Sequence, residues 1–84
     1  MQHEEKTIAL KDFYQSVVLK TLGFHLLNVQ QGEGKFCVFV FADPNLTADA
    51  ALERYWNGQL EKVDARDLIG NIKELKNRIF ARTM

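Results

Sequence analysis

Three short groupings of residues have types and spacings that suggest chemistry. The run Gly32-Glu33-Gly34-Lys35 resembles part of a phosphate-binding loop. Such a loop also needs a glycine five residues before the Gly-Lys pair and a serine or threonine after it. Val29 and Phe36 stand at those two positions, so this run is better explained as a hairpin loop. Asp64 and Asp67, one helical turn apart, are best explained as residues that cap a helix and complement its dipole.

His25 and Cys37 are the third grouping, a candidate metal site or nucleophile pair. Zinc is normally held by four ligands, and the other histidine, His3, lies in the polar N-terminus. A cysteine in an apolar strand usually packs as a small core residue. We therefore expect no metal, no cofactor and no catalytic residue, and predict that the protein is not an enzyme.

The last part of the chain carries a group of cations with only Glu74 among them: Lys73, Lys76, Arg78 and Arg82. They could contact a nucleic-acid backbone or an acidic partner. They also suit the negative end of a helix dipole, and helical spacing spreads them around the axis. Nucleic-acid binding through this basic helix is therefore the alternative function, and it is not favoured.

Composition narrows the function further. The chain has 84 residues, 46% of them hydrophobic, and its 11 basic and 11 acidic residues sum to zero net charge. We predict one domain over residues 1–84, with residues 1–6 as a flexible tail. There is no apolar run long enough for a membrane span, and the polar start does not resemble a secretion signal. With a single cysteine, a cytoplasmic location is expected.

Hydrophobic periodicity and capping residues give the elements that must position these groups. They predict an α+β fold in the order α-β-β-α-(β)-α, in which three amphipathic helices pack on a small antiparallel sheet. The predicted segments are a helix over 13–22 capped by Asp12, a hairpin 24–31/35–42, a helix over 48–57 capped by Thr47 or Asn45, an uncertain edge strand over 59–63, and a helix over 65–81 capped by Asp64.

The helical wheels place individual side chains. In the first helix Phe13 and Val17 share the apolar face, Ser16 lies opposite them, and Leu19 falls outside the stripe. In the last helix Lys76 falls within the apolar arc, so we expect it to be half-buried with its ammonium reaching water.

The second strand of the hairpin is apolar on both faces. Phe36, Val38 and Val40 point one way, and Cys37, Phe39 and Phe41 point the other. A sheet with one solvated face would alternate with polar residues, and this strand does not. If helices cover one face, a second copy of the chain could cover the other. We therefore predict a protein-binding or structural module, most simply a homodimer, with an interface near Leu27, Val29, Phe39 and Phe41.

Several short pieces in serial order give the chain a family resemblance. They are Asp12-Phe13-Tyr14, Thr21-Leu22-Gly23-Phe24, Phe36 to Phe41, Tyr55-Trp56-Asn57-Gly58, Val63-Asp64-Ala65-Arg66 and Lys73-Glu74-Leu75-Lys76. In this order they resemble a family of short prokaryotic and phage-borne proteins known only as a domain of unknown function. The resemblance implies the same fold and supplies no catalytic residue.

Overall fold

The computed structural model describes residues 6–32 and 36–83. It has an α+β fold, as predicted, with three helices and a three-stranded antiparallel sheet. The elements in chain order are β1 (Thr7–Leu10), α1 (Phe13–Thr21), β2 (Leu26–Gln31), β3 (Cys37–Ala42), α2 (Ala48–Trp56) and α3 (Ala65–Thr83). Residues 33–35, with most of the predicted hairpin loop, and most of the predicted N-terminal tail lie outside the described residues.

The sheet has the strand order β1-β3-β2, so β3 is central and both its neighbours are edge strands. The register pairs Ala9 with Val40 on one side of β3 and Val29 with Phe39 on the other. A bulge interrupts β2 between Leu26 and Asn28. β3 is therefore paired along both edges. Its side chains differ in which of the two faces of the sheet they lie on.

β1 is not among the elements predicted from the sequence. Thr-Ile-Ala-Leu is only four residues long, yet it alternates so that Ile8 and Leu10 lie on the covered side of the sheet. Lys6, assigned to the predicted tail, also takes part, since its carbonyl accepts a hydrogen bond of 2.8 Å from the backbone N–H of Asp43.

The helices begin where acidic side chains accept their first N–H groups. Asp12 Oδ1 accepts from the Gln15 N–H at 2.8 Å, and Asp64 Oδ1 accepts from the Arg66 N–H at 2.8 Å, as predicted. For α2, Thr47 takes the N-cap position, one of the two residues predicted for it, but its side chain makes no capping hydrogen bond. Asp43 Oδ1 accepts from the N–H groups of Thr47 (2.9 Å) and Ala48 (3.2 Å), because the turn that precedes α2 folds this buried carboxylate back onto the helix start.

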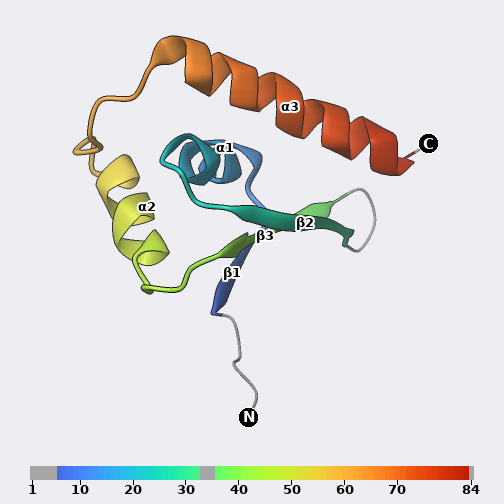
Figure 1. Cartoon of the computed structure of the whole chain (residues 1–84), viewed down its shortest axis with the longest axis horizontal. Coiled ribbons are helices and arrows are strands. Elements are labelled where there is room, and N and C mark those ends of the chain that lie inside the picture. Colours follow the sequence, from blue (N-terminus) through green and yellow to red (C-terminus); the bar gives the residue numbers. More distant parts are fainter. Residues whose placement is uncertain (1–5, 33–35, 84) are drawn as a thin grey trace.

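Helix α1 lies between the sheet and α3, and it also packs against α2 (Figure 1). Because α1 has neighbours on several sides, the predicted single apolar face was too narrow. Leu19 and Ser16 are both fully buried, although Leu19 was placed outside the stripe and Ser16 opposite it. The Ser16 hydroxyl is satisfied by donating to the Asp12 carbonyl at 2.9 Å.

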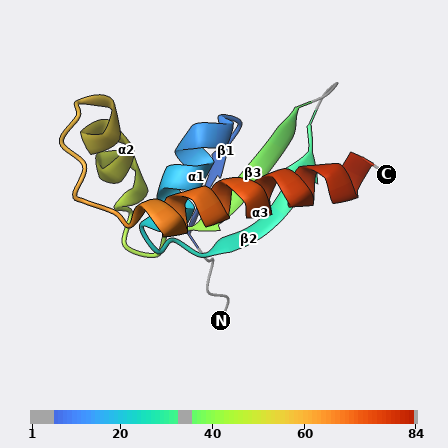
Figure 2. The ribbon, with the colours of Figure 1, turned by 90° about the horizontal axis from the view of Figure 1, so that it is seen from above.

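Helix α3 runs above β2 and past the end of α1 (Figure 2). Its Leu75 is fully buried, whereas Ile69 and Phe80 on the same helix are 52% and 64% exposed. Lys76 is exposed and not half-buried as predicted, since the covered side of α3 is narrower than the wheel suggested. The uncertain strand over 59–63 is an irregular connection that leads into α3.

Candidate interaction surfaces

The sheet has one face covered by helices and one that is not. The inner face carries the side chains under α1 and α3: Ile8, Leu10, Val29, Cys37, Phe39 and Phe41. The outer face carries those with the opposite orientation: Thr7, Ala9, Asn28, Gln30, Val38, Val40 and Ala42. In the described part of the chain, no helix packs on the outer face (Figures 1 and 2).

None of the outer-face residues is charged, in a chain of which 26% is Asp, Glu, Lys or Arg. Its centre is apolar, because Val38, Val40 and Ala42 lie in the middle strand and are half-buried by their neighbours. Phe36, which precedes β3 in the same alternation, is 66% exposed. Antiparallel sheets commonly expose a polar face, so an uncharged, apolar-centred face is a candidate contact surface.

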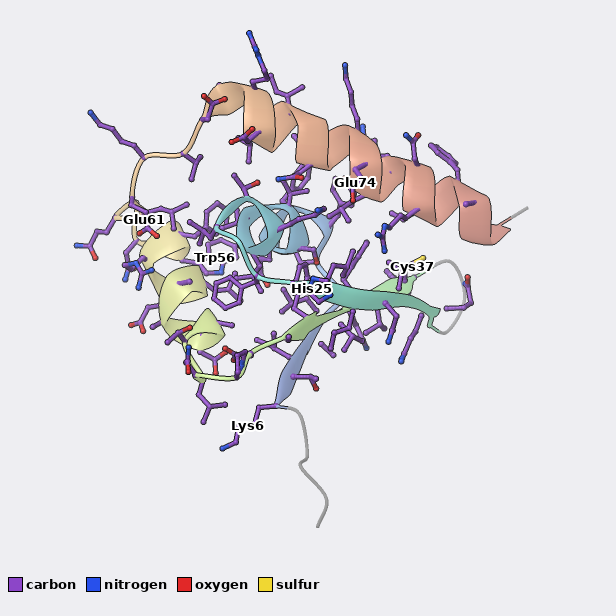
Figure 3. All side chains as sticks on the ribbon, in the orientation of Figure 1. Lys6, His25, Cys37, Trp56, Glu61 and Glu74 are labelled. Atoms are coloured by element: carbon purple, nitrogen blue, oxygen red, sulfur yellow. The ribbon has the colours of Figure 1, made fainter. Side chains whose placement is uncertain are left out.

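The structure places the predicted interface residues elsewhere. Phe39 and Phe41 are 1% and 0% exposed on the inner face, and Val29 is 7% exposed. These three belong to the core of the single chain and offer no surface to a second copy in this fold. The largest side chains of the strand fill the space under the helices, so the face left open is the one with the smaller valines. Figure 3 shows Cys37 on the helix side of the sheet.

Leu27, the fourth predicted interface residue, is half-buried at the bulge of β2 and lines a groove between β2 and α3. The groove has a volume of about 370 Å³ and is lined by Leu27, Asn28, Val29, Arg78 and Ala81. Two groups of residues that the sequence did not connect therefore line the same groove: the apolar residues of β2 and Arg78 of the basic helix. A periodicity analysis could not have paired them, because about 50 residues separate them along the chain.

The predicted basic helix is α3, and its cations do not form one patch. Lys73 and Lys76 are exposed, while Arg78 and Lys20 both approach Glu74, with N–O distances of 3.9 and 3.3 Å. Glu74 faces α1 from the underside of α3 (Figure 3). The side chain of Arg82 lies outside the described part of the structure. The described cations are thus partly paired and spread around the helix.

The two residues considered for metal binding lie far apart. The Ala42 N–H donates to the His25 carbonyl at 2.9 Å, which places His25 beside the end of β3 opposite to Cys37. Five residues of strand at ~3.4 Å each separate these positions by about 17 Å. Within residues 6–32 and 36–83, no three potential ligands come together in a metal-binding group. Nor is any described helix both long and apolar enough to cross a bilayer.

Comparison with protein families gives one match, to a domain of unknown function, DUF5659, over residues 5–81. The chain belongs to the DUF5659 family. The match confirms the resemblance to a domain of unknown function, while its prokaryotic or phage-borne origin stays a prediction. Comparisons with curated proteins and with solved structures found no match.

Proposed function

We propose that this DUF5659 domain is a non-enzymatic protein-interaction module of the cytoplasm that self-associates through the outer face of its sheet. The observation that carries the proposal is the absence of charge from that face, around an apolar centre of Val38 and Val40. Desolvation of ions and the approach of like charges both oppose the pairing of identical surfaces. Burying this uncharged face involves neither cost.

A second copy is the occupant that suits this face. Two uncharged sheets can stack at ~10 Å with interdigitated side chains, as in β-sandwiches. A twofold axis through the face would place Val38 and Val40 of each copy at the centre, and Phe36 of each copy at the margin of the contact. An acidic or basic partner would gain no electrostatic attraction from such a face.

The size of the face sets the expected affinity. Three strands spaced ~4.8 Å apart, with four to six residues each rising ~3.4 Å, present about 300 Å² per copy. A dimer through this face alone would bury about 600 Å², well below the ~1,200–2,000 Å² of stable complexes. We therefore expect a weak dimer, with Kd on the order of 100 μM, that dissociates on dilution.

Sedimentation equilibrium from about 10 μM to 1 mM tests the proposal, because this range brackets the expected Kd. Wild type should move from monomer to dimer across the series. Val40→Lys places a charge at the centre of the stack and should weaken the dimer at least about tenfold. Ala50→Lys, on the exposed side of α2, adds the same charge away from the sheet and should leave the dimer unchanged.

A wild-type chain that stays strictly monomeric at 1 mM would refute self-association. A dimer that Val40→Lys does not weaken, while circular dichroism shows both variants folded, would exclude the outer face as the interface. Neither result would argue against the fold itself, because Val40 is not one of the fully buried core residues.

Nucleic-acid binding through Lys73, Lys76, Arg78 and Arg82 is not the function we propose. Backbone binding is favoured by several cations that reach phosphates from one side, and Arg78 instead shares Glu74 with Lys20. A gel-shift series with single- and double-stranded DNA and RNA at 20 mM salt would separate the two functions. Salt-sensitive shifts at micromolar protein would favour the basic helix over the sheet.

A further inference from the structure

The open edge of β2 has backbone groups that another strand could pair with. β2 ends the sheet, and the hydrogen bond from the Gly32 N–H to the Phe36 carbonyl (2.8 Å) fixes which residues face β3. In an antiparallel pair, every second residue directs its backbone N–H and C=O toward the partner strand. Because Gly32 does so, Gln30 and Asn28 also direct their backbone groups toward β3, and the N–H and C=O of Val29 point away from it. No proline or charged residue within β2 blocks this edge.

The α3–β2 groove runs beside this edge. Leu27 and Ala81 are its accessible apolar lining, Val29 lines it while remaining largely buried, and Arg78 is also in the lining. In Figures 1 and 2 the second half of α3 extends over β2, so a chain lying along β2 would have the helix beside it. An edge strand next to a helix, with a groove between them, is the geometry that supports recognition by strand addition.

The charge at the groove selects the occupant. Arg78 is the one charged residue among the groove's described lining, and its side chain is 46% exposed. Its contact with Glu74 is long, at 3.9 Å, and Lys20 competes for the same carboxylate oxygen at 3.3 Å. One carboxylate therefore serves two cations, which leaves positive charge at the groove. An acidic group on the occupant would complement it.

We propose that the α3–β2 groove binds a short, extended, acidic segment of a partner protein as an added strand on β2. The segment pairs with the backbone of Val29, places an aliphatic side chain against Leu27 and Ala81, and presents a carboxylate to Arg78. The bulge between Leu26 and Asn28 limits regular pairing to the far part of β2, so the bound core is about four residues. Among the described residues this surface and the outer face share Asn28, but Arg78 belongs to the groove and Val40 to the outer face, so the two proposals can fail independently.

Selection from a phage-displayed library of random heptapeptides tests this proposal without assuming a particular partner. Peptides enriched on the full chain should combine an aliphatic residue with Asp or Glu. Synthetic copies with a fluorescent label should bind Arg78→Gln at least about tenfold more weakly than wild type, because a charge-assisted contact is lost. Backbone amide exchange at Val29 should slow when the peptide is bound.

Lys76→Gln is the matched control, since it removes the same charge from an exposed position two residues away, outside the groove lining. It should bind the peptides as wild type does. Ala81→Trp fills the groove and should reduce binding without removing any charge. Circular dichroism checks that each variant is folded before its affinity is compared.

The proposal is overturned if no sequences enrich, if the enriched peptides are basic, or if Arg78→Gln and Lys76→Gln weaken binding equally. It is also overturned if Arg78→Gln weakens the dimer and not peptide binding, which would make the groove a contact between copies. The Val40→Lys variant keeps the two surfaces distinguishable, because it should bind peptide normally while failing to dimerise.

Discussion

The two faces of β3 are both apolar, yet they have different surroundings. On the inner face Cys37, Phe39 and Phe41 are at most 7% exposed beneath the helices. On the outer face Val38 and Val40 remain partly exposed, and Phe36 is 66% exposed. An apolar pattern on both sides of a strand therefore marks a capacity for burial on each side. Which side the chain covers itself depends on where its helices pack.

The sharpest way to test the difference between the faces is to truncate one side chain on each. Phe39→Ala should destabilise the domain by about 3–5 kcal/mol, because it leaves a cavity under α1, whereas Val40→Ala should cost less than about 1 kcal/mol. Urea unfolding of dilute protein, where the chain is monomeric, measures both. If Phe39→Ala does not fold, Phe39→Leu should still cost more than Val40→Ala. Equal losses would contradict the assignment of faces.

Thiol accessibility gives a second, smaller contrast. Cys37 is 7% exposed, so its reaction with a thiol reagent should wait for local opening of the structure. A Val38→Cys chain in a Cys37→Ala background presents its thiol on the outer face and should react about 100-fold faster. Stopped-flow labelling with a chromogenic disulfide measures both rates. A native Cys37 that reacts as fast as the outer-face thiol would argue against the covered inner face.

The smallest expected effect concerns salt. Because the outer face carries no charge, the dimer Kd should change less than about twofold between 50 and 500 mM NaCl. Sedimentation equilibrium at both salt concentrations measures it. A dimer that weakens tenfold over this range would instead depend on ion pairs, and α3 would then be the more suitable surface.

Local sequence signals predicted most of the elements, because each depends on nearby residues. Asp12 and Asp64 were recognised as caps, and Gly23, with φ of 101°, ends α1 in a conformation that favours glycine. β1 was not predicted, because a four-residue strand has little periodicity and is stabilised mainly by its pairing with β3. Thr47 was also predicted as a possible N-cap of α2, but the capping role of Asp43 was not, because Asp43 lies four residues before Thr47.

The candidate surfaces were only partly predictable. The two-faced character of β3 was visible in the sequence, and it still motivates the proposed dimer. Phe39 and Phe41 were predicted to contact a second copy of the chain, but the helices cover the face on which both side chains lie. The groove was not predicted, because it forms where α3 passes over β2. These two elements are far apart in the sequence, and local patterns carry no information about their contact.

The amino-acid sequence by itself determined the α+β class, the hairpin, the three helices and the presence of more apolar strand surface than one helical layer covers. Those features follow from short-range periodicity, capping and turn residues. Only the tertiary structure decided which face of β3 is the core, that β1 joins the sheet, and that Arg78 lies beside Leu27. These depend on how α1 and α3 pack, and packing is settled by contacts between residues far apart in the chain.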